Sequence, residues 1–156
     1  MNFFSDFEFY WIRENIVAGS SRPQSVEDIK FIIEQGIKRI ISISEPGLIQ
    51  NLAKGLPIEI IPFEFDNYGV PSNHQLQDYL NIMQNSIKEH KPVLIHCAMG
   101  CGRTGLLLTA YLMNFENKDW ETSLLEVREI RSCAVESSIQ LKYLSSLNIE
   151  KKFFDK

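Results

Sequence analysis

The spacing of hydrophobic and polar residues along the chain changes several times, and each change predicts a secondary-structure element. Short apolar runs at 9–12 and 16–18, on either side of a polar turn at 13–15, predict a β-hairpin. Further apolar runs at 37–43 and 58–62 predict two more strands. The run 91–95 is almost wholly apolar, which is typical of a strand at the buried centre of a sheet.

Helical spacing of apolar residues appears between these strands and after the last of them. Ser25 and Ser72 are candidate N-caps, which predict one short helix and one long amphipathic helix. The segments 104–115, 118–131 and 137–153 predict three more helices. Strands that alternate with helices, followed by helices alone, predict an α/β fold with a central four- to five-stranded, mostly parallel sheet flanked by helices on both faces.

Length and composition limit the classes of protein to consider. The 156 residues, 44% of them hydrophobic, fit a single domain over 1–156 with one sizeable core. With 16 basic against 20 acidic residues and no Lys/Arg-rich run, we expect neither a nucleic-acid partner nor an anionic membrane partner. The first residues include Asp6 and Glu8 and do not resemble a signal peptide.

Cysteine usage bears on the cellular compartment. The three cysteines, Cys97, Cys101 and Cys133, show neither metal-ligand spacing nor a disulfide framework. They suit a reducing environment, so we expect a cytoplasmic protein. We also expect a monomer that uses no metal ion and no other cofactor.

The candidate chemistry lies in the segment His-Cys-Ala-Met-Gly-Cys-Gly-Arg-Thr-Gly at 96–105, between a predicted strand and a predicted helix. Gly100 and Gly102 allow positive φ angles, so successive backbone N–H groups can point inward as an anion-binding nest beside the helix N-terminus. Arg103 offers a planar fork for two phosphate oxygens. The predicted phosphate-binding residues are therefore Arg103 together with Ala98, Met99, Gly100, Cys101 and Gly102.

The same surroundings favour Cys97 as a thiolate nucleophile. Cysteines at helix N-termini have pKa values of roughly 3.5–7.5, against about 8.5 for a free thiol. The predicted reaction is attack on a phosphoester to form a phosphocysteine, which water then hydrolyses. The Thr104 hydroxyl can donate a hydrogen bond to the sulfur, and His96 is expected to orient the loop from behind.

Cys97 and Arg103 with five residues between them, preceded by His and followed by Thr-Gly, resemble the signature of the protein tyrosine phosphatase superfamily. The residue sequence of the loop is similar to that of the small, atypical dual-specificity branch and its compact archaeal relatives. Further similar pieces are Val17-Ala18-Gly19-Ser20 with Pro23, Gly69-Val70-Pro71-Ser72, and Ala134-Val135-Glu136 with Gln140.

The resemblance implies an aspartate general acid on a mobile loop after the strand that ends near Pro62. In relatives the acid commonly stands four residues before the proline, but here that position holds Asn67, which cannot donate the proton. Asp66 is therefore the predicted acid and Glu64 the fallback; the alternative is that both are simply solvated loop charges.

The resemblance also gives Gln140 the role of orienting water in the second step, or else it is a polar residue on an amphipathic helix. Ser132-Cys133 stand where relatives often have Pro-Gly, so the backbone there is expected to differ. Cys101 either fills space in the loop or traps oxidised Cys97 as a reversible disulfide, and Cys133 is expected to be structural.

The predicted function is that of a cysteine-dependent phosphomonoester hydrolase whose partner is a phosphorylated protein. It would act on phosphotyrosine and, through a shallow site, on phosphoserine and phosphothreonine. Two alternatives remain open: a phosphatase for a phosphoinositide or an RNA 5′-phosphate, and a weakly active phospho-binding module. The loop contains no lysine to meet additional phosphates, which ranks polyphosphorylated substrates second.

Overall fold

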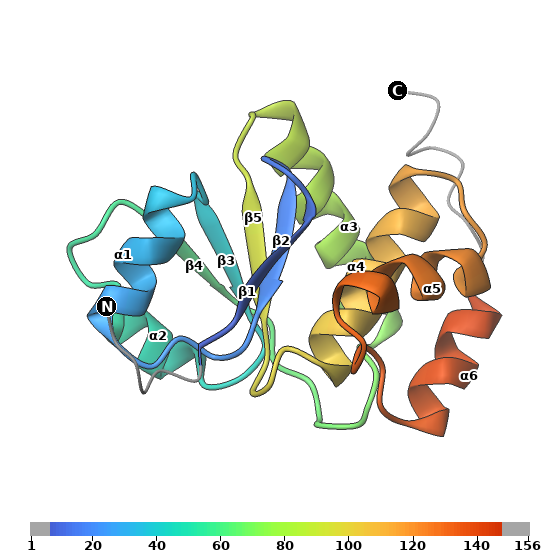
Figure 1. The fold of residues 1–156 in the computed structure, drawn as a ribbon. Coiled ribbons are helices and arrows are strands. Elements are labelled where there is room, and N and C mark those ends of the chain that lie inside the picture. The colour runs from blue at the N-terminus through green and yellow to red at the C-terminus, as the bar shows by residue number, and fades with distance from the viewer. Residues whose placement is uncertain (1–6, 148–156) are drawn as a thin grey trace.

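The computed structural model describes residues 7–147, which form a five-stranded sheet with helices on both faces (Figure 1). The strands are β1 (Phe9–Arg13), β2 (Val17–Ser20), β3 (Arg39–Ser42), β4 (Glu59–Pro62) and β5 (Val93–His96), in the order β1-β2-β5-β3-β4. Only β1 is antiparallel to its neighbour, because a short turn joins it to β2. The predicted mostly parallel α/β sheet is confirmed.

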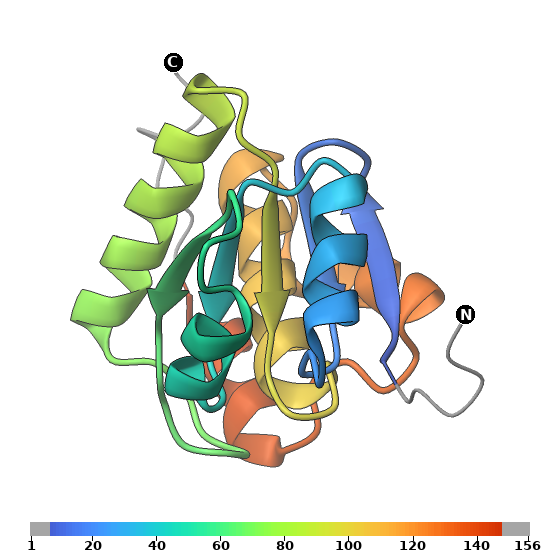
Figure 2. The same cartoon turned by 90° about the vertical axis from the view of Figure 1, so that its left-hand side faces the viewer.

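Within residues 7–147, six helices cover the sheet: α1 (Val26–Glu34), α2 (Pro46–Leu52), α3 (Asn73–Lys88), α4 (Gly102–Phe115), α5 (Trp120–Ile130) and α6 (Ser138–Ser146). Helices α1 and α2 lie on one face, and α3 to α6 lie on the other (Figures 1 and 2). Each face has its own apolar core. Ile29, Ile32 and Ile49 pack in the first core, and α4 supplies much of the second, larger one.

Local sequence signals account for most of these boundaries. The Ser25 side chain accepts a hydrogen bond from the Asp28 amide, and Ser72 forms a capping box with Gln75, as the predicted N-caps require. Helix α2 was not predicted, because Glu45-Pro46-Gly47 is typical of a turn; here Pro46 occupies the first helical turn, where its missing N–H costs nothing. Residues 148–153 of the predicted last helix lie outside the described residues.

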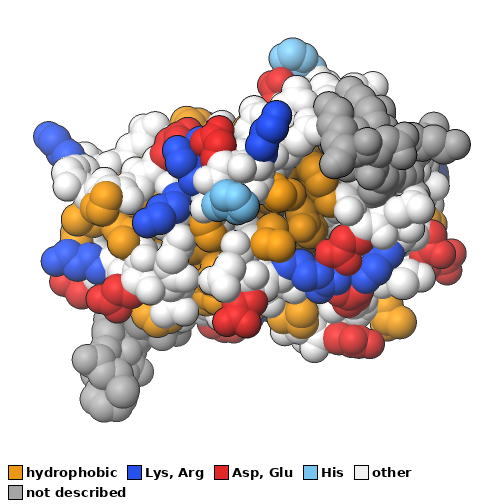
Figure 3. Space-filling model, turned by 90° about the horizontal axis from the view of Figure 1, so that it is seen from above, with side chains coloured by type: hydrophobic (Ala, Val, Ile, Leu, Met, Phe, Trp, Pro, Cys, Tyr) orange, Lys and Arg blue, Asp and Glu red, His pale blue; other side chains and the backbone are white. Residues whose placement is uncertain are grey.

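Strand β5 lies between β2 and β3, and all four of its residues are buried, as its apolar sequence predicts. The carboxyl ends of the four parallel strands share one edge of the sheet, where ligands bind in such folds. Cys97 follows β5 at that edge. Figure 3 shows the opposite end of the molecule, where charged and apolar side chains are interspersed. Among the described residues, no helix has both the length and the apolar character needed to cross a membrane.

Candidate active site

Residues 97–103, named the phosphate loop after their predicted ligand, connect β5 to the first turn of α4 and carry the chemistry predicted from the sequence. Cys97 is a free cysteine that is only 3% exposed. Arg103 stands in the first turn of α4 and is also buried. The strand and the helix therefore hold the predicted nucleophile and the predicted phosphate-binding arginine on one short, rigid connection.

Backbone hydrogen bonds orient this loop, because each carbonyl from Cys97 to Cys101 accepts a hydrogen bond. The His96 Nδ1 donates to the Cys97 carbonyl (3.0 Å), and the Arg22 amide donates to the Ala98 carbonyl (3.0 Å). The Arg131 Nη2 donates to the Met99 carbonyl (2.7 Å), and the Tyr10 hydroxyl donates to the Gly100 carbonyl (2.7 Å). The Cys101 carbonyl accepts from the amides of Gly105 (2.8 Å) and Val135 (3.3 Å). A trans peptide is planar, so the N–H after each carbonyl points the opposite way. The amides of residues 98–102 therefore face the other side, which fits the predicted anion nest.

Gly100 is needed for this course of the backbone. Its φ angle is +74°, in the region that favours glycine. A Cβ atom at this position would also lie 2.6 Å from the backbone carbonyl of Ser20. No other residue fits here without moving the loop away from β2.

Two buried side-chain groups at the site have no hydrogen-bond partner among the described residues: the Arg103 Nε and the Thr104 hydroxyl. Leaving such groups unpaired is costly, and most buried polar groups in proteins are paired. The Arg103 Nη1 donates to the Phe65 carbonyl (3.2 Å), which leaves Nε to serve an anion. The arginine fork and the amide nest together suit a phosphate group.

His96 supports the loop from behind, where the sequence places it. It is fully buried, and burial lowers its pKa from 6.5 to about 4, so the ring is neutral near pH 7. A carbonyl oxygen only accepts, so Nδ1 carries the proton and donates to the Cys97 carbonyl. Nε2 then accepts from the Ser42 hydroxyl at 2.7 Å, which ties the loop to β3.

The candidate acids stand on the segment 63–71, between β4 and the N-cap of α3, which is named the acid segment. Asp66 and Glu64 are both exposed. The carbonyl of Phe65, next to Asp66, accepts from Arg103, whereas the carbonyl of Glu64 accepts from the Gln75 side chain of α3. The backbone next to Asp66 is thus tied to Arg103, the predicted phosphate-binding residue, which favours Asp66 over Glu64 as the acid. Its role stays a prediction.

Gln140 connects α6 to the acid segment. Its side-chain oxygen accepts from the amides of Glu136 and Ser137, and its Nε2 donates to the Gly69 carbonyl at 3.1 Å. Ser137 adds a hydrogen bond from its hydroxyl to the Tyr68 carbonyl. The Ser-x-x-Gln capping pattern signals the cap of α6 but not this connection. Gln140 also lies beside Gly102, so its predicted role in orienting water stays a prediction.

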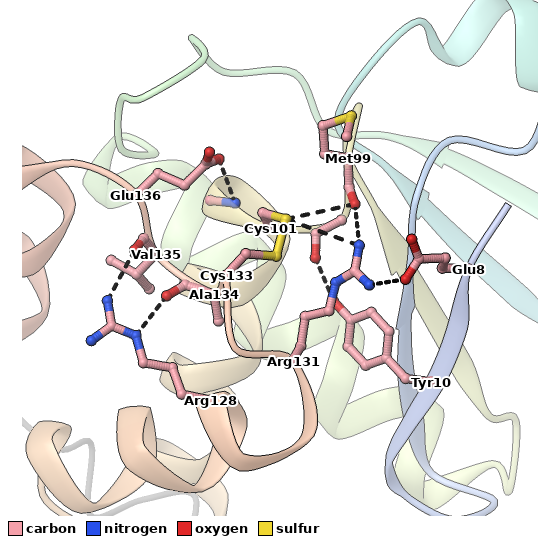
Figure 4. The surroundings of a disulfide bond; sticks show 12 residues. Glu8, Tyr10, Met99, Cys101, Arg128, Arg131, Cys133, Ala134, Val135 and Glu136 are labelled. Atoms are coloured by element: carbon pink, nitrogen blue, oxygen red, sulfur yellow. Dashed lines mark hydrogen bonds and ion pairs between the residues drawn. A yellow bond between two sulfur atoms is a disulfide. The ribbon is translucent and has the colours of Figure 1, made fainter. Parts of the chain in front are cut away.

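A disulfide joins Cys101 to Cys133 (Figure 4). The expectation that the cysteines form no disulfide framework was therefore wrong, as were both interpretations of Cys101, space filler and trap for Cys97. The two cysteines are 32 residues apart in the sequence, and only the fold brings the end of α5 to the phosphate loop. Because disulfides persist mainly in oxidising compartments, the cysteine argument for the cytosol no longer holds.

Sequence reasoning missed Tyr10 and Arg131, which support the loop from its outer side (Figure 4). Tyr10 comes from β1, and burial raises the pKa of its hydroxyl well above the usual value, so it remains a donor to the Gly100 carbonyl. Arg131 caps α5, pairs with Glu8, and lies 5.3 Å from the centre of the Tyr10 ring. No local pattern signals either contact, because both join distant segments.

Comparisons with known proteins agree with this geometry. The family model for the Swiss Army Knife protein, DSP-PTPase phosphatase domain (PTP-SAK), matches residues 6–148. Protein tyrosine phosphatase domain-containing protein 1 of Bos taurus is 32% identical over 84% of this chain, but the match covers only 19% of that protein. AMV078 of Amsacta moorei entomopoxvirus, a protein assigned to the tyrosine-protein phosphatases, is 30% identical over 86% of this chain and 85% of its own length.

Solved structures show the same fold. Tk-PTP in its active form superposes with a TM-score of 0.79 at 26% identity, over 90% of this chain and 97% of that one. PTPMT1 in complex with PI(5)P superposes with a TM-score of 0.77 at 19% identity, over 88% and 92% of the two chains, and shows the fold alone. The chain spans 19–21% of the length of the animal relatives it matches. It belongs to the Swiss Army Knife family of dual-specificity and tyrosine phosphatase domains.

Proposed function

We propose that this domain hydrolyses phosphotyrosine in proteins, and phosphoserine or phosphothreonine more slowly, through a phosphocysteine at Cys97. The observation that carries the proposal is the phosphate loop itself. Its carbonyls accept hydrogen bonds from residues outside the loop, which turns the amides of residues 98–102 towards the other side. Beside them lie a buried cysteine and an arginine whose Nε has no partner among the described residues. This arrangement neutralises a transferring phosphoryl group without a metal ion.

The reaction would proceed in two steps. In the first, the Cys97 thiolate attacks phosphorus, the bond from phosphorus to the ester oxygen breaks, and Asp66 gives that oxygen a proton. In the second, water attacks the phosphocysteine, Asp66 takes back a proton, and phosphate leaves as the thiolate forms again. Arg103 and the loop amides would stabilise the charge on phosphorus in both steps. The Thr104 hydroxyl, which has no partner among the described residues, would donate to the sulfur.

The surroundings of the loop favour a phosphorylated side chain over a phosphoinositide. Met99 and Tyr68 are 67% and 54% exposed and belong to the two segments of the site, so they offer apolar surface to an aromatic ring. None of the residues between Cys97 and Arg103 is a lysine that could meet a second phosphate. A related fold was solved with PI(5)P in PTPMT1 and another with pTyr in P. aeruginosa TpbA, so the fold itself is compatible with both classes.

Release of p-nitrophenol from p-nitrophenyl phosphate, measured in the presence of a chelator, tests the chemistry. Cys97→Ser should lower kcat by at least about 10⁴-fold, because it removes the nucleophile. An unchanged rate in Cys97→Ser, or no turnover by the wild type, would overturn the proposal. A panel of phosphotyrosyl, phosphothreonyl, phosphoinositide and RNA 5′-phosphate substrates then tests the substrate class, and a higher kcat/KM for either of the last two would replace the protein substrate.

A further inference from the structure

A carboxylate of this chain lies at the phosphate loop. The amide of Gly102 donates a hydrogen bond to the Oε1 of Glu136 at 2.9 Å (Figure 4). Gly102 is the first residue of α4, next to Arg103, and its amide follows the Cys101 carbonyl, which accepts from Gly105 and Val135. Glu136 therefore occupies an N–H group that a bound phosphate oxygen would use.

Hydrogen bonds hold the backbone around Glu136 in place, so its side chain extends from a fixed position beside Gly102. The amide of the preceding residue, Val135, donates to the Cys101 carbonyl, and the Glu136 amide donates to Gln140. Arg128 donates to the carbonyls of Ala134 (2.8 Å) and Val135 (3.0 Å). The disulfide from Cys133 fixes the start of the same segment.

Gly102 also permits this contact by having no side chain. A Cβ atom at this position would lie 2.6 Å from the Glu136 Oε1. Any other residue would push the carboxylate away from the amide. The pairing of a glycine in the loop with an acidic residue opposite it is thus a built feature of the site.

The charge of Glu136 has consequences for substrate choice. Glu136 is exposed as a residue, so its carboxylate can turn towards water when one phosphate displaces it. A second phosphate next to the reacting one would still face that negative charge at short range. Two unit charges about 4 Å apart repel by about 1 kcal/mol even in bulk water, and by more near a protein surface.

We propose that Glu136 is a specificity-determining residue, which competes with phosphate for the Gly102 amide and disfavours substrates that carry two adjacent phosphates. This proposal deepens the proposed function, because it limits the substrates to phosphomonoesters with an isolated phosphate.

The test measures binding, so it does not depend on turnover. Inorganic phosphate, O-phosphotyrosine and inositol 4,5-bisphosphate are titrated by calorimetry into Cys97→Ser and into Cys97→Ser/Glu136→Gln. We expect Glu136→Gln to tighten inorganic phosphate about fivefold or more, which corresponds to removing one repulsive unit charge. Binding of inositol bisphosphate should tighten by a larger factor than that of phosphotyrosine.

Glu129→Gln in the same background is the matched control, because it removes one negative charge from an exposed position on α5 and should change no affinity. Thermal unfolding of each variant verifies that it is folded. Unchanged or weaker phosphate binding in the Glu136→Gln variant would overturn the competition, and equal factors for all three ligands would overturn the selectivity. Failure of the wild type to hydrolyse phosphotyrosine would overturn the proposed function while leaving both binding results in force.

Discussion

The two segments of the site are held very differently. In the phosphate loop every carbonyl from Cys97 to Cys101 accepts a hydrogen bond, and a disulfide ties the loop to the end of α5. In the acid segment the two candidate carboxylates, Glu64 and Asp66, are exposed. Side chains of α3, α4 and α6, and the Ser137 cap, donate to its backbone carbonyls and leave these carboxylates free of such contacts among the described residues.

The difference matches the work that each segment would do. A nest of amides stabilises charge only when its geometry is set before the reaction, so the phosphate loop must be rigid. A proton donor must approach the leaving oxygen and then allow product to leave, so it suits a segment with exposed side chains. Changes in the phosphate loop should therefore affect both binding and rate, and changes in the acid segment should affect rate alone.

After loss of the nucleophile in Cys97→Ser, Arg103→Lys should have the largest effect on activity. Lysine keeps the charge but cannot present two parallel N–H groups to phosphate, so we expect kcat/KM to fall by about 10³-fold. Steady-state kinetics with p-nitrophenyl phosphate measures this. Arg39→Lys makes the same change at an ion pair at the amino end of β3 and should leave activity unchanged; similar losses in both variants would contradict the assignment.

Breaking the disulfide should loosen the outer side of the phosphate loop. The disulfide joins residues that are 32 positions apart in the sequence, so Cys133→Ser should destabilise the protein by roughly 3–4 kcal/mol, from the loss of the constraint on the unfolded chain. Thermal or denaturant unfolding with and without a dithiol reductant measures the effect. Reductant should lower the midpoint of the wild type to that of the variant and leave the variant unchanged; a wild-type midpoint that ignores reductant would show that the bond contributes nothing.

Asp66→Asn tests the acid segment. Loss of the proton donor should lower kcat by about 10²-fold or more for esters with poor leaving groups, and far less for those with good ones. It should also remove the decline in rate that follows deprotonation of the acid as the pH rises. Glu64→Gln is the matched change two residues away, and it should alter neither kcat nor the pH dependence of the rate. A larger effect of Glu64→Gln would make Glu64 the general acid.

Tyr10→Phe should have the smallest effect. It removes the hydroxyl that donates to the Gly100 carbonyl but keeps the ring, so kcat/KM should fall by about 3- to 10-fold, with a rise in KM, as the loss of one hydrogen bond predicts. Tyr143→Phe is the control: it removes a buried hydroxyl that has no partner among the described residues, and it should leave kcat/KM unchanged. An unchanged KM in Tyr10→Phe would show that the loop keeps its shape without this support.

The sequence by itself determined what depends on neighbouring residues. Alternating polarity and caps such as Ser25 and Ser72 place most of the elements, because capping and periodicity act over a few positions. The segment 96–105 predicts the nucleophile, the phosphate-binding arginine and the nest together, because all of them lie in one short stretch of chain. The sequence did not predict helix α2, because local pattern cannot distinguish a short helix that begins with Pro-Gly from a turn.

Only the tertiary structure decided what supports that loop and what competes for it. Tyr10 lies 90 residues from the carbonyl that it holds, and Arg131, Cys133 and Glu136 reach the loop from 32 to 34 residues away. Such contacts form because β1 packs at the edge of the sheet and because α5 and α6 return over α4. Local sequence does not predict that packing, because the same residue type can lie on the surface, in the core or in a functional site, depending on which distant residues the fold places next to it.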